Sequence, residues 1–290
     1  MKVIYAKAYA KLNLSLDVLS KRPDGYHDLC MVMQSVEHHD DVSILLNTEG
    51  RFYAQSDRHY LPNDERNIAL KAARLFLEAT GHGGMGASVR LRKRIPVCAG
   101  LGGGSSDAAA VLRALNEHFG RPLDRQGLEA LGLQLGMDVP YCVAGGTALA
   151  EGRGEVLTPL TPMPETDVVI CKPDFPISTP ELFRRIDGRT SRCRPDTAGI
   201  LVALERGDVK GLSRRMFNVF EDVLDRRAND INSIKSMLLG FGAYGAVMSG
   251  TGSAVFALFP DAEHAKWAAD SLRPLHRETY VTKTISRLEV

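Results

Sequence analysis

Hydrophobic and polar positions alternate in several short segments, which predicts strands. Apolar residues at positions 12, 14, 16 and 18 alternate with polar ones, and this period of two predicts a strand with one buried face. The apolar runs 29–36 and 42–46 extend the expected sheet, and Asp40 and Asp41 between them predict a turn. The segment 87–95 alternates again, whereas the polar segment 51–66 is expected to form a loop.

Apolar positions three and four residues apart predict helices. The segment 67–80 has one apolar face and stops before Gly81. Another helix is expected up to Gly120, and Asp124 is expected to cap the next. Thr179 is the expected cap of a helix with Pro180 at its first position.

The second half of the chain mixes both patterns. Strands are expected at 168–171, 254–259 and 279–288, and helices at about 197–205, 209–220, 231–239 and 262–272. Strands with helices laid beside them predict an α+β fold. At 290 residues the chain suggests one large or two ordinary domains, and the proline-rich stretch 159–164 is the expected boundary.

Composition changes this picture little. Lys and Arg number 36 against 35 Asp and Glu, so charge gives no reason to expect nucleic acid or an anionic membrane as a partner. Five widely spaced cysteines without a C-x-x-C motif indicate neither a disulfide framework nor a zinc ribbon. The first 13 residues are too polar for a signal peptide, and no apolar run is long enough to span a bilayer. We therefore expect a cytoplasmic protein.

A glycine-rich loop is the strongest chemical signal. Residues 96–109 read P-V-C-A-G-L-G-G-G-S-S-D-A-A, between an expected strand and an expected helix. Glycines let the backbone approach a ligand closely, and the first amides of a helix attract anions. Ser105 and Ser106 add hydroxyl donors and are expected to cap the helix. A nucleotide phosphate is the natural ligand, while a linker or a capping turn is the alternative.

The loop does not match the best-known nucleotide motifs. No lysine follows its last glycine, as a P-loop would require. The spacing only partly fits a dinucleotide fingerprint, and no acidic residue follows about twenty positions later. The loop alone is therefore moderately specific.

Four other features are candidates for chemistry. Lys11 stands at the head of the first alternating segment, where a solvated strand-end lysine is the simpler interpretation. Asp138 lies among apolar residues just before Pro140, and a catalytic base and a plain helix cap are equally good interpretations. The cluster S-G-T-G-S at 249–253 is either a tight turn or a segment packed on the glycine loop or a substrate. His27 by itself is most simply a structural histidine.

Three of these motifs together resemble the GHMP kinase superfamily. They are A-K-L-N-L at 10–14, the glycine loop at 96–109, and S-G-T-G-S at 249–253. The segments R-P-D-G-Y-H at 22–27, G-M-D-V-P at 136–140 and I-S-T-P-E-L-F at 177–183 are similar to members that act on a cytidine-diphosphate-linked methylerythritol. The resemblance covers essentially the whole chain.

The resemblance implies a fold, a reaction and a cofactor. It implies two domains, at 1–160 (like the second domain of ribosomal protein S5) and 161–290, with the active site in the cleft between them. It implies transfer of the γ-phosphoryl group of ATP, with Mg²⁺, to the 2-hydroxyl of the methylerythritol unit, giving the 2-phosphate and ADP in isoprenoid precursor biosynthesis. The expected partner is this small molecule, and the chain is expected to be a monomer or a homodimer.

The resemblance also assigns residues. Lys11 and Asp138 fall at the catalytic positions. The implied nucleotide-binding residues are Asn67, Ile68, Pro96, Gly100, Leu101, Gly102, Gly103, Gly104, Ser105 and Ser106, with Ser106 also the candidate metal ligand. The implied substrate-binding residues are Asn13, Tyr26, His27, Thr179, Phe183, Gly250, Thr251 and Gly252. Tyr26 and Phe183 would sandwich the cytosine, and His27 would read its edge.

Two alternatives remain open at this point. One is another GHMP small-molecule kinase, acting on homoserine or mevalonate, for which the expected cytosine pocket would have no purpose. The other is a non-catalytic sensor that binds a nucleotide and a metabolite on the same fold. Retention of both Lys11 and Asp138 argues against a sensor.

Overall fold

The computed structural model describes residues 3–188 and 193–288. Its strands are β1 (Ile4–Lys21), β2 (His27–Asn47), β3 (Phe52–Ser56), β4 (Gly86–Arg92), β5 (Thr147–Gly152), β6 (Val156–Pro159), β7 (Asp167–Lys172), β8 (Phe217–Asn218), β9 (Gly245–Met248), β10 (Val255–Phe259) and β11 (Glu278–Ile285). Its helices are α1 (Ile68–Ala79), α2 (Gly103–His118), α3 (Arg125–Leu133), α4 (Val139–Ala144), α5 (Thr179–Asp187), α6 (Thr197–Glu205), α7 (Val209–Ser213), the 3₁₀ helix η1 (Val219–Val223), α8 (Ala228–Gly240) and α9 (Ala262–Leu272). This mixture confirms the predicted α+β class.

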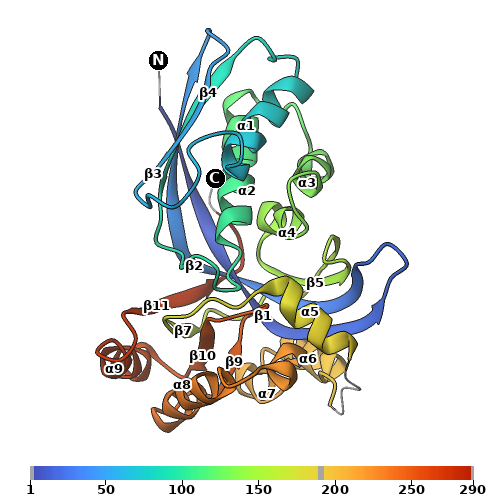
Figure 1. The fold of residues 1–290 in the computed structure, drawn as a ribbon. Helices are drawn as coiled ribbons and strands as arrows, with labels where there is room; N and C mark the ends of the chain where they lie inside the picture. The colour runs from blue at the N-terminus through green and yellow to red at the C-terminus, as the bar shows by residue number, and fades with distance from the viewer. Residues whose placement is uncertain (1–2, 189–192, 289–290) are drawn as a thin grey trace.

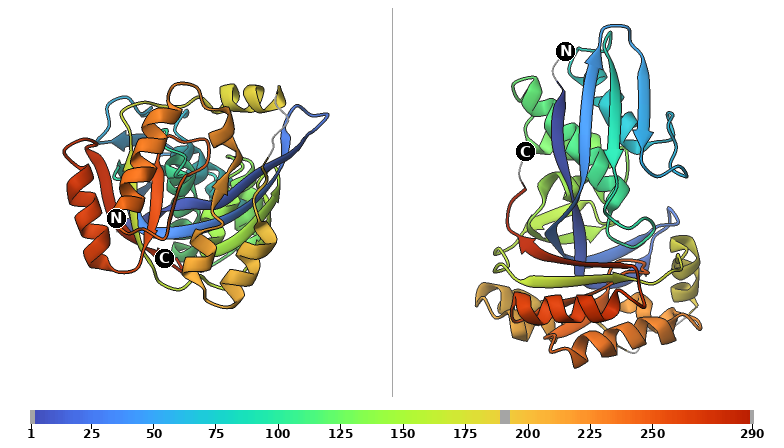
Figure 2. Two further views of the ribbon diagram at one scale, coloured as in Figure 1. Left: turned by 90° about the horizontal axis from the view of Figure 1, so that it is seen from below. Right: turned by 90° about the vertical axis from the view of Figure 1, so that its left-hand side faces the viewer.

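The strands join into one mixed sheet that runs through both halves. Its order is β3–β4–β2–β11–β7–β10–β9, while β1 and β5 pair with β2, β6 with β5, and β8 with β1. Helices α1 to α4 lie on one side of the N-terminal strands, and α8 and α9 lie on the outer side of the C-terminal ones (Figures 1 and 2). No described helix is long and apolar enough to cross a membrane.

The last strand connects the two halves. Residues 278–283 of β11 pair with β7, and Thr284 and Ile285 pair with β2. The proline-rich stretch 159–164 begins at the last residue of β6 and leads towards β7, where the chain passes from one half to the other. The division into domains 1–160 and 161–290 stays a prediction.

β1 corrects the prediction of one buried face. Leu12 and Leu14 pack in one core cluster, whereas Leu16 and Val18 pack in another. The pairing register with β2 shifts between Asn13 and Ser15, and such a bulge sends the following side chains to the opposite face. The strand is therefore covered on both sides.

The turn predicted at Asp40 and Asp41 is wrong, because β2 runs unbroken from His27 to Asn47. Asp40 is fully buried. Its carboxylate accepts hydrogen bonds from the backbone N–H groups of Arg94 and Ile95 at 2.5 and 2.8 Å, and from the Lys93 ammonium group. These partners offset the cost of burying a charge inside a strand, and they are distant in sequence.

Two further predictions fail where tertiary contacts override local pattern. The expected loop 51–66 contains the edge strand β3, which pairs in parallel with β4. The helix expected at 209–220 is shorter, because α7 ends at Ser213 and β8 and η1 follow. The Asn218 side chain there donates to the carbonyls of Met248 and Gly250, both at 2.7 Å.

The predicted helix caps give a mixed result. Asp124 caps α3 through the N–H of Gly127 at 2.8 Å, as expected. Thr179 does not cap α5, whose N-cap position is Ser178 without a side-chain bond. Neither Ser105 nor Ser106 caps α2, because its N-cap is Gly102 in the left-handed conformation.

Candidate active site

Two adjoining cavities bring the predicted site residues together. The larger, of about 730 Å³, contains Lys11, Asp138, Tyr26, His27, Thr179, Phe183, Gly250, Thr251 and Gly252 in its lining. The smaller, of about 350 Å³, is lined by Asn67, Ile68, Pro96 and residues 100–105 among others. Cys98, Gly100, Gly102 and Ser105 line both. The glycine loop therefore forms the wall at which the two cavities meet.

The glycine loop ends in an uncapped helix start. Gly102 has a φ of 70°, and α2 begins at the next residue with no side-chain cap. Its first backbone N–H groups thus keep no helical partner, which makes this end attractive to an anion. A Cβ atom at Gly102 would lie 2.9 Å from Cγ of Lys11. Glycine is needed here so that the Lys11 side chain can pass over the loop.

The S-G-T-G-S segment packs on the glycine loop, so the simple-turn interpretation is insufficient. The Ser249 hydroxyl donates to the Gly100 carbonyl at 2.9 Å, and the N–H of Ala254 donates to the Ala99 carbonyl at 3.1 Å. A Cβ atom at Gly100 would lie 2.0 Å from the Ser249 carbonyl oxygen. The two loops therefore fit together only because Gly100 has no side chain.

Lys11 is held at the junction of the cavities. It lies in the middle of β1, and only 4% of its surface is exposed, which rules out the solvated strand-end interpretation. Its ammonium group donates to Oδ1 of Asn13 at 2.6 Å and lies 3.7 Å from Oδ2 of Asp138. Its backbone N–H donates to the Leu101 carbonyl at 3.1 Å, which ties β1 to the glycine loop.

Asp138 faces the larger cavity. It occupies the N-cap position of α4 but makes no side-chain capping bond, so the plain-cap interpretation has no support in the geometry. Its side chain is 37% exposed. The carboxylate is thus accessible to a ligand, beside a buried cation. This arrangement can orient a hydroxyl group and accept its proton.

Asn13 does not face the cavity in which the substrate is expected to bind. It is fully buried, accepts a hydrogen bond from Lys11, and directs its Nδ2 at the Met31 sulfur at 3.3 Å. It is absent from the lining of the larger cavity. Its contacts orient the Lys11 ammonium group.

Aromatic residues gather at the far end of the larger cavity. His27 and Phe183 stack with ring centroids 4.7 Å apart, and Tyr26 is 51% exposed. His27 comes from β2 just after the hairpin turn and Phe183 from α5, which lies beside the hairpin tip (Figure 2). The predicted sandwich of Tyr26 and Phe183 around a base stays a prediction, because in this structure His27 itself stacks on Phe183.

His27 is oriented by an acidic residue that sequence reasoning missed. Its Nε2 lies 2.7 Å from Oδ1 of Asp187, and the Lys21 ammonium group donates to Oδ2 of the same carboxylate at 2.5 Å. The hydrogen bond with His27, followed by that from Lys21, lowers the pKa of the Asp187 carboxyl below its ordinary value. No local motif marks Asp187, which closes α5 far along the chain from His27.

Arginines at this end were also missed. The Arg153 guanidinium lies over the Tyr26 ring, 5.3 Å from its centroid, and Arg153 and Arg184 both line the larger cavity. Arg153 belongs to the turn after β5 and Arg184 to α5, so only folding brings these cations together. They place two guanidinium groups at the cavity wall, where an anionic ligand could accept hydrogen bonds from them.

Beside the smaller cavity, the Asn67 side chain makes hydrogen bonds that hold the surrounding backbone. Its Oδ1 caps α1 by accepting from the N–H of Ala69 at 3.0 Å, and its Nδ2 donates to the Pro62 carbonyl at 3.0 Å. Ile68 and Pro96 line the cavity beside it. A base bound here would meet the apolar side chain of Ile68 and the backbone that Asn67 holds in place.

Ser106, the candidate metal ligand, is buried behind the loop. Its hydroxyl donates to the Tyr9 carbonyl at 2.6 Å and lies 3.4 Å from the Cys142 sulfur. It does not line either cavity. In this geometry Ser106 fastens α2 to β1. No group of three or more His, Cys, Asp or Glu side chains with metal-binding geometry occurs among residues 3–188 and 193–288.

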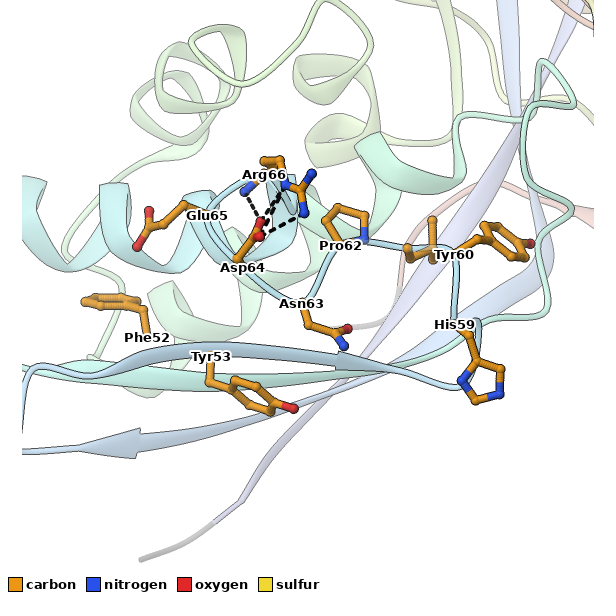
Figure 3. A pocket seen from close by; sticks show the side chains of 10 residues that line it. Phe52, Tyr53, His59, Tyr60, Pro62, Asn63, Asp64, Glu65 and Arg66 are labelled. Atoms are coloured by element: carbon orange, nitrogen blue, oxygen red, sulfur yellow. Dashed lines mark hydrogen bonds and ion pairs between the residues drawn. The ribbon is translucent and has the colours of Figure 1, made fainter.

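A third hollow lies beside the smaller cavity. This groove of about 720 Å³ is lined by β3 and by residues 59–66. Figure 3 shows Asp64 paired with Arg66, and Tyr53 and Tyr60 on the groove's wall. Leu61, Pro62 and Arg66 also line the smaller cavity. The segment is therefore a thin wall between the groove and the candidate nucleotide site.

Comparison with known proteins agrees with this arrangement. The family model described as the GHMP kinases N terminal domain matches residues 67–146, and that described as GHMP kinases C terminal matches residues 200–274. The 4-diphosphocytidyl-2-C-methyl-D-erythritol kinase of Clostridium botulinum (strain Loch Maree) is 40% identical over 97% of this chain and 99% of its own length. That of Clostridium perfringens (strain ATCC 13124) is 40% identical over 97% of this chain and 98% of its own.

Solved structures extend the comparison. A crystal structure of 4-(cytidine 5'-diphospho)-2C-methyl-D-erythritol kinase aligns with a TM-score of 0.82 and 35% identity, over 97% of this chain and 99% of that one. A homoserine kinase from Cytophaga hutchinsonii aligns with a TM-score of 0.75 at 20% identity, over 100% and 96%, which shows a common fold only. The chain belongs to the GHMP kinases, and within them to the 4-diphosphocytidyl-2-C-methyl-D-erythritol kinase family.

Proposed function

We propose that this chain transfers the γ-phosphoryl group of ATP to the 2-hydroxyl of 4-diphosphocytidyl-2-C-methyl-D-erythritol, giving the 2-phosphate and ADP. One observation carries the proposal. The Lys11–Asp138 pair, with 3.7 Å between its charged atoms, stands where a cavity lined by the glycine loop meets a cavity lined by Tyr26, His27 and Phe183. The family of the chain supports the same reaction.

The nucleotide would lie in the smaller cavity, with its phosphates at the start of α2. The uncapped amides there are suited to phosphate oxygens. No lysine follows the last glycine as in a P-loop, so the backbone of residues 100–105 carries this part of the binding. The residues we assign to the nucleotide are Asn67, Ile68, Pro96, Gly100, Leu101, Gly102, Gly103, Gly104 and Ser105.

Phosphoryl transfer makes modest demands on protein side chains. The transition state is loose, so positioning and electrostatic stabilisation do most of the work. As the hydroxyl oxygen bonds to the γ-phosphorus, the bond to the bridging oxygen of ADP breaks, and the hydroxyl proton passes to Asp138. A carboxylate is a weak base for an alcohol, so Asp138 accepts the proton late and chiefly orients the hydroxyl. Lys11, held by Asn13, would place its ammonium group beside the reacting oxygens.

Mg²⁺ fits this site as a companion of ATP. Mg²⁺ prefers oxygen ligands and usually binds through one or two carboxylates together with substrate phosphates. The Asp138 carboxylate and the Ser105 hydroxyl line the cavity and are the donors that fit, in place of the buried Ser106. The ion, when bound, would neutralise phosphate charge.

The cytidine end of the substrate would lie among Tyr26, His27 and Phe183. Cytosine is uncharged, so stacking and edge hydrogen bonds are the economical way to select it. Asp187 orients His27 for this contact. Thr179 and Thr251, whose hydroxyl oxygens are 2.7 Å apart, would lie along the substrate with Gly250 and Gly252. We further propose that residues 1–160 and 161–290 are the two domains that enclose it.

The direct test is ADP release by the purified protein with ATP and Mg²⁺. The substrates to compare are 4-diphosphocytidyl-methylerythritol, the same compound without its cytidine, homoserine and mevalonate. We expect turnover only with the cytidine compound. Turnover with homoserine or mevalonate would remove the cytosine assignment. Nucleotide binding without turnover on any substrate would instead favour a sensor.

A further inference from the structure

A buried ion network lies beneath the glycine loop and has no role in the chemistry above. The Lys93 ammonium group donates to Asp40, to Oδ2 of Asp107 at 2.5 Å, and to the Gly103 carbonyl at 3.5 Å. The exposed fractions of the three ionisable side chains are 3% for Lys93, 0% for Asp40 and 4% for Asp107. Water therefore does not screen this network.

The network joins the two ends of the glycine loop. On the incoming side, Asp40 accepts from the backbone N–H groups of Arg94 and Ile95. On the outgoing side, Lys93 holds Asp107 and Gly103, both in the first two turns of α2. The residues between these anchors are the loop itself. One cluster of side chains thus fixes the separation of the loop's ends.

Lys93 does not replace a P-loop lysine. It lines the smaller cavity, but its ammonium group is nearly inaccessible and each of its three N–H bonds has an acceptor in the network. Direct contact with phosphate would require breaking a buried ion pair and would leave a buried carboxylate without its partner, which is strongly unfavourable. Its contribution to binding must therefore act through the loop.

Stability alone does not explain such a network. Buried ion pairs often contribute little net stability, because desolvation offsets their attraction, and apolar residues of similar volume do as well or better. Compared with apolar side chains, charged groups joined by directional hydrogen bonds hold the surrounding backbone in a more fixed geometry. A loop whose ends are held loses less conformational entropy when it closes on a ligand.

We propose that Asp40, Lys93 and Asp107 are positioning residues that hold the glycine loop in the shape required by the nucleotide phosphates. The proposal rests on the proposed function, because it assumes that the loop binds ATP. It assigns a role to Asp107, the acidic residue of the glycine-loop motif, which borders the smaller cavity with only 4% of its side chain exposed and has no role in the scheme above.

Two uncharged variants of Asp107 separate the loss of its hydrogen bond with Lys93 from the loss of its ionisable group. Asp107→Asn keeps an oxygen atom that can accept the hydrogen bond from Lys93. Asp107→Leu has a side chain of similar size but no acceptor atom. Both leave the Lys93–Asp40 pair balanced, so both are expected to fold. Arg113→Met is the matched control: Arg113 is also buried on α2, but it donates to the carbonyls of Cys142 and Lys7, away from the loop.

The measurements are calorimetric binding of a non-hydrolysable ATP analogue with Mg²⁺, KM for ATP and for the cytidine substrate, and Tm. We expect Asp107→Leu to bind the analogue about tenfold more weakly. This is roughly the effect of losing one hydrogen bond to a charged group, here the bond between Asp107 and the Lys93 ammonium group. KM for ATP should rise by the same factor, and KM for the cytidine substrate should stay within about twofold. Asp107→Asn should bind like the wild type, and Arg113→Met should lower Tm alone.

Equal affinity of the Leu and Asn variants would overturn the inference. If Asp107→Leu does not fold, Asp107→Ala, which introduces no bulk, gives the same comparison with Asp107→Asn. Lack of analogue binding by the wild-type chain would instead contradict the proposed function. The two failures are therefore distinguishable.

Discussion

The two ends of the candidate site are built in different ways. The phosphate-binding part of the nucleotide end is one continuous loop, residues 96–105, whose backbone is packed on Ser249 and Ala254. The cytidine end is assembled from side chains of the β1–β2 hairpin and α5, with Tyr26 half exposed. Phosphate needs backbone amides at a fixed spacing, whereas a base needs flat side chains. The first requirement leaves a contiguous motif in the sequence, and the second leaves scattered residues.

The largest expected effect is at the junction of the two ends. Asp138→Asn removes the proton acceptor while preserving the size of the side chain. We expect kcat to fall by about 10²- to 10⁴-fold, the usual contribution of a positioned acid or base, with the affinity for the analogue in the absence of Mg²⁺ changed little. Steady-state kinetics and calorimetry check this. Near-normal kcat would show that Asp138 has no role in proton transfer.

At the nucleotide end, Gly100→Ala should be severely damaging. The new Cβ would lie 2.0 Å from the Ser249 carbonyl oxygen, at a residue with a φ of +76°. We expect loss of measurable ATP binding and destabilisation of about 2–4 kcal/mol, as for other overpacked or strained sites.

Gly104→Ala is the control for that variant, because the role assigned to Gly104 belongs to its backbone, which alanine keeps. Its Cβ would meet only the Ile68 side chain, at 3.4 and 3.9 Å, within a regular helix. Calorimetry and denaturant unfolding should find this variant close to the wild type. Equal damage in the two variants would mean that the loop needs glycine at both positions, and that the contact between Gly100 and Ser249 is not the reason.

At the cytidine end, Phe183→Ala should act on one substrate only. Loss of the ring that stacks on His27 is expected to raise KM for the cytidine substrate about tenfold or more, because aromatic contacts add roughly 0.5–1.5 kcal/mol beyond area burial. KM for ATP should be unchanged. An equal rise in both KM values would indicate general damage to the fold and contradict a dedicated base pocket.

The smallest effect concerns pH and the loop network. Burial raises the pKa of the Asp107 carboxyl to about 8; the facing Lys93 ammonium group opposes that rise and the Asp40 carboxylate adds to it. The folded chain therefore binds more protons than the unfolded chain between about pH 4 and pH 8, and the free energy of unfolding should fall as pH rises through this window.

Between pH 7 and pH 8 this fall amounts to about 1 kcal/mol. Denaturant unfolding of the wild type and Asp107→Asn at both pH values checks it, because the variant has no carboxyl to titrate. A difference between the two proteins that does not change with pH would mean that Asp107 titrates outside this range.

Much of the fold was predictable because local signals were strong. The helix at 67–80, the strand–loop–helix order around the glycine loop and the cap at Asp124 depend on neighbouring residues, and the structure confirms them. The failures at Asp40 and in the segment 209–220 share one cause. In both cases the deciding partners are distant in sequence. At Asp40 they satisfy a polar side chain that the local pattern assigns to a turn, and in the segment 209–220 they end a helix that the local pattern would continue.

The candidate site divides in the same way. The sequence alone determined the family motifs, the anion-binding character of the glycine loop and the candidacy of Lys11 and Asp138, because these depend on residue types at short spacings. Only the tertiary structure decided that Lys11 is buried, that Asn13 holds it, that Ser106 faces away from the cavities, and that Asp187 and Arg153 belong to the site. Such facts depend on a bulge in β1 and on contacts between residues far apart in the chain, which short-range patterns do not record.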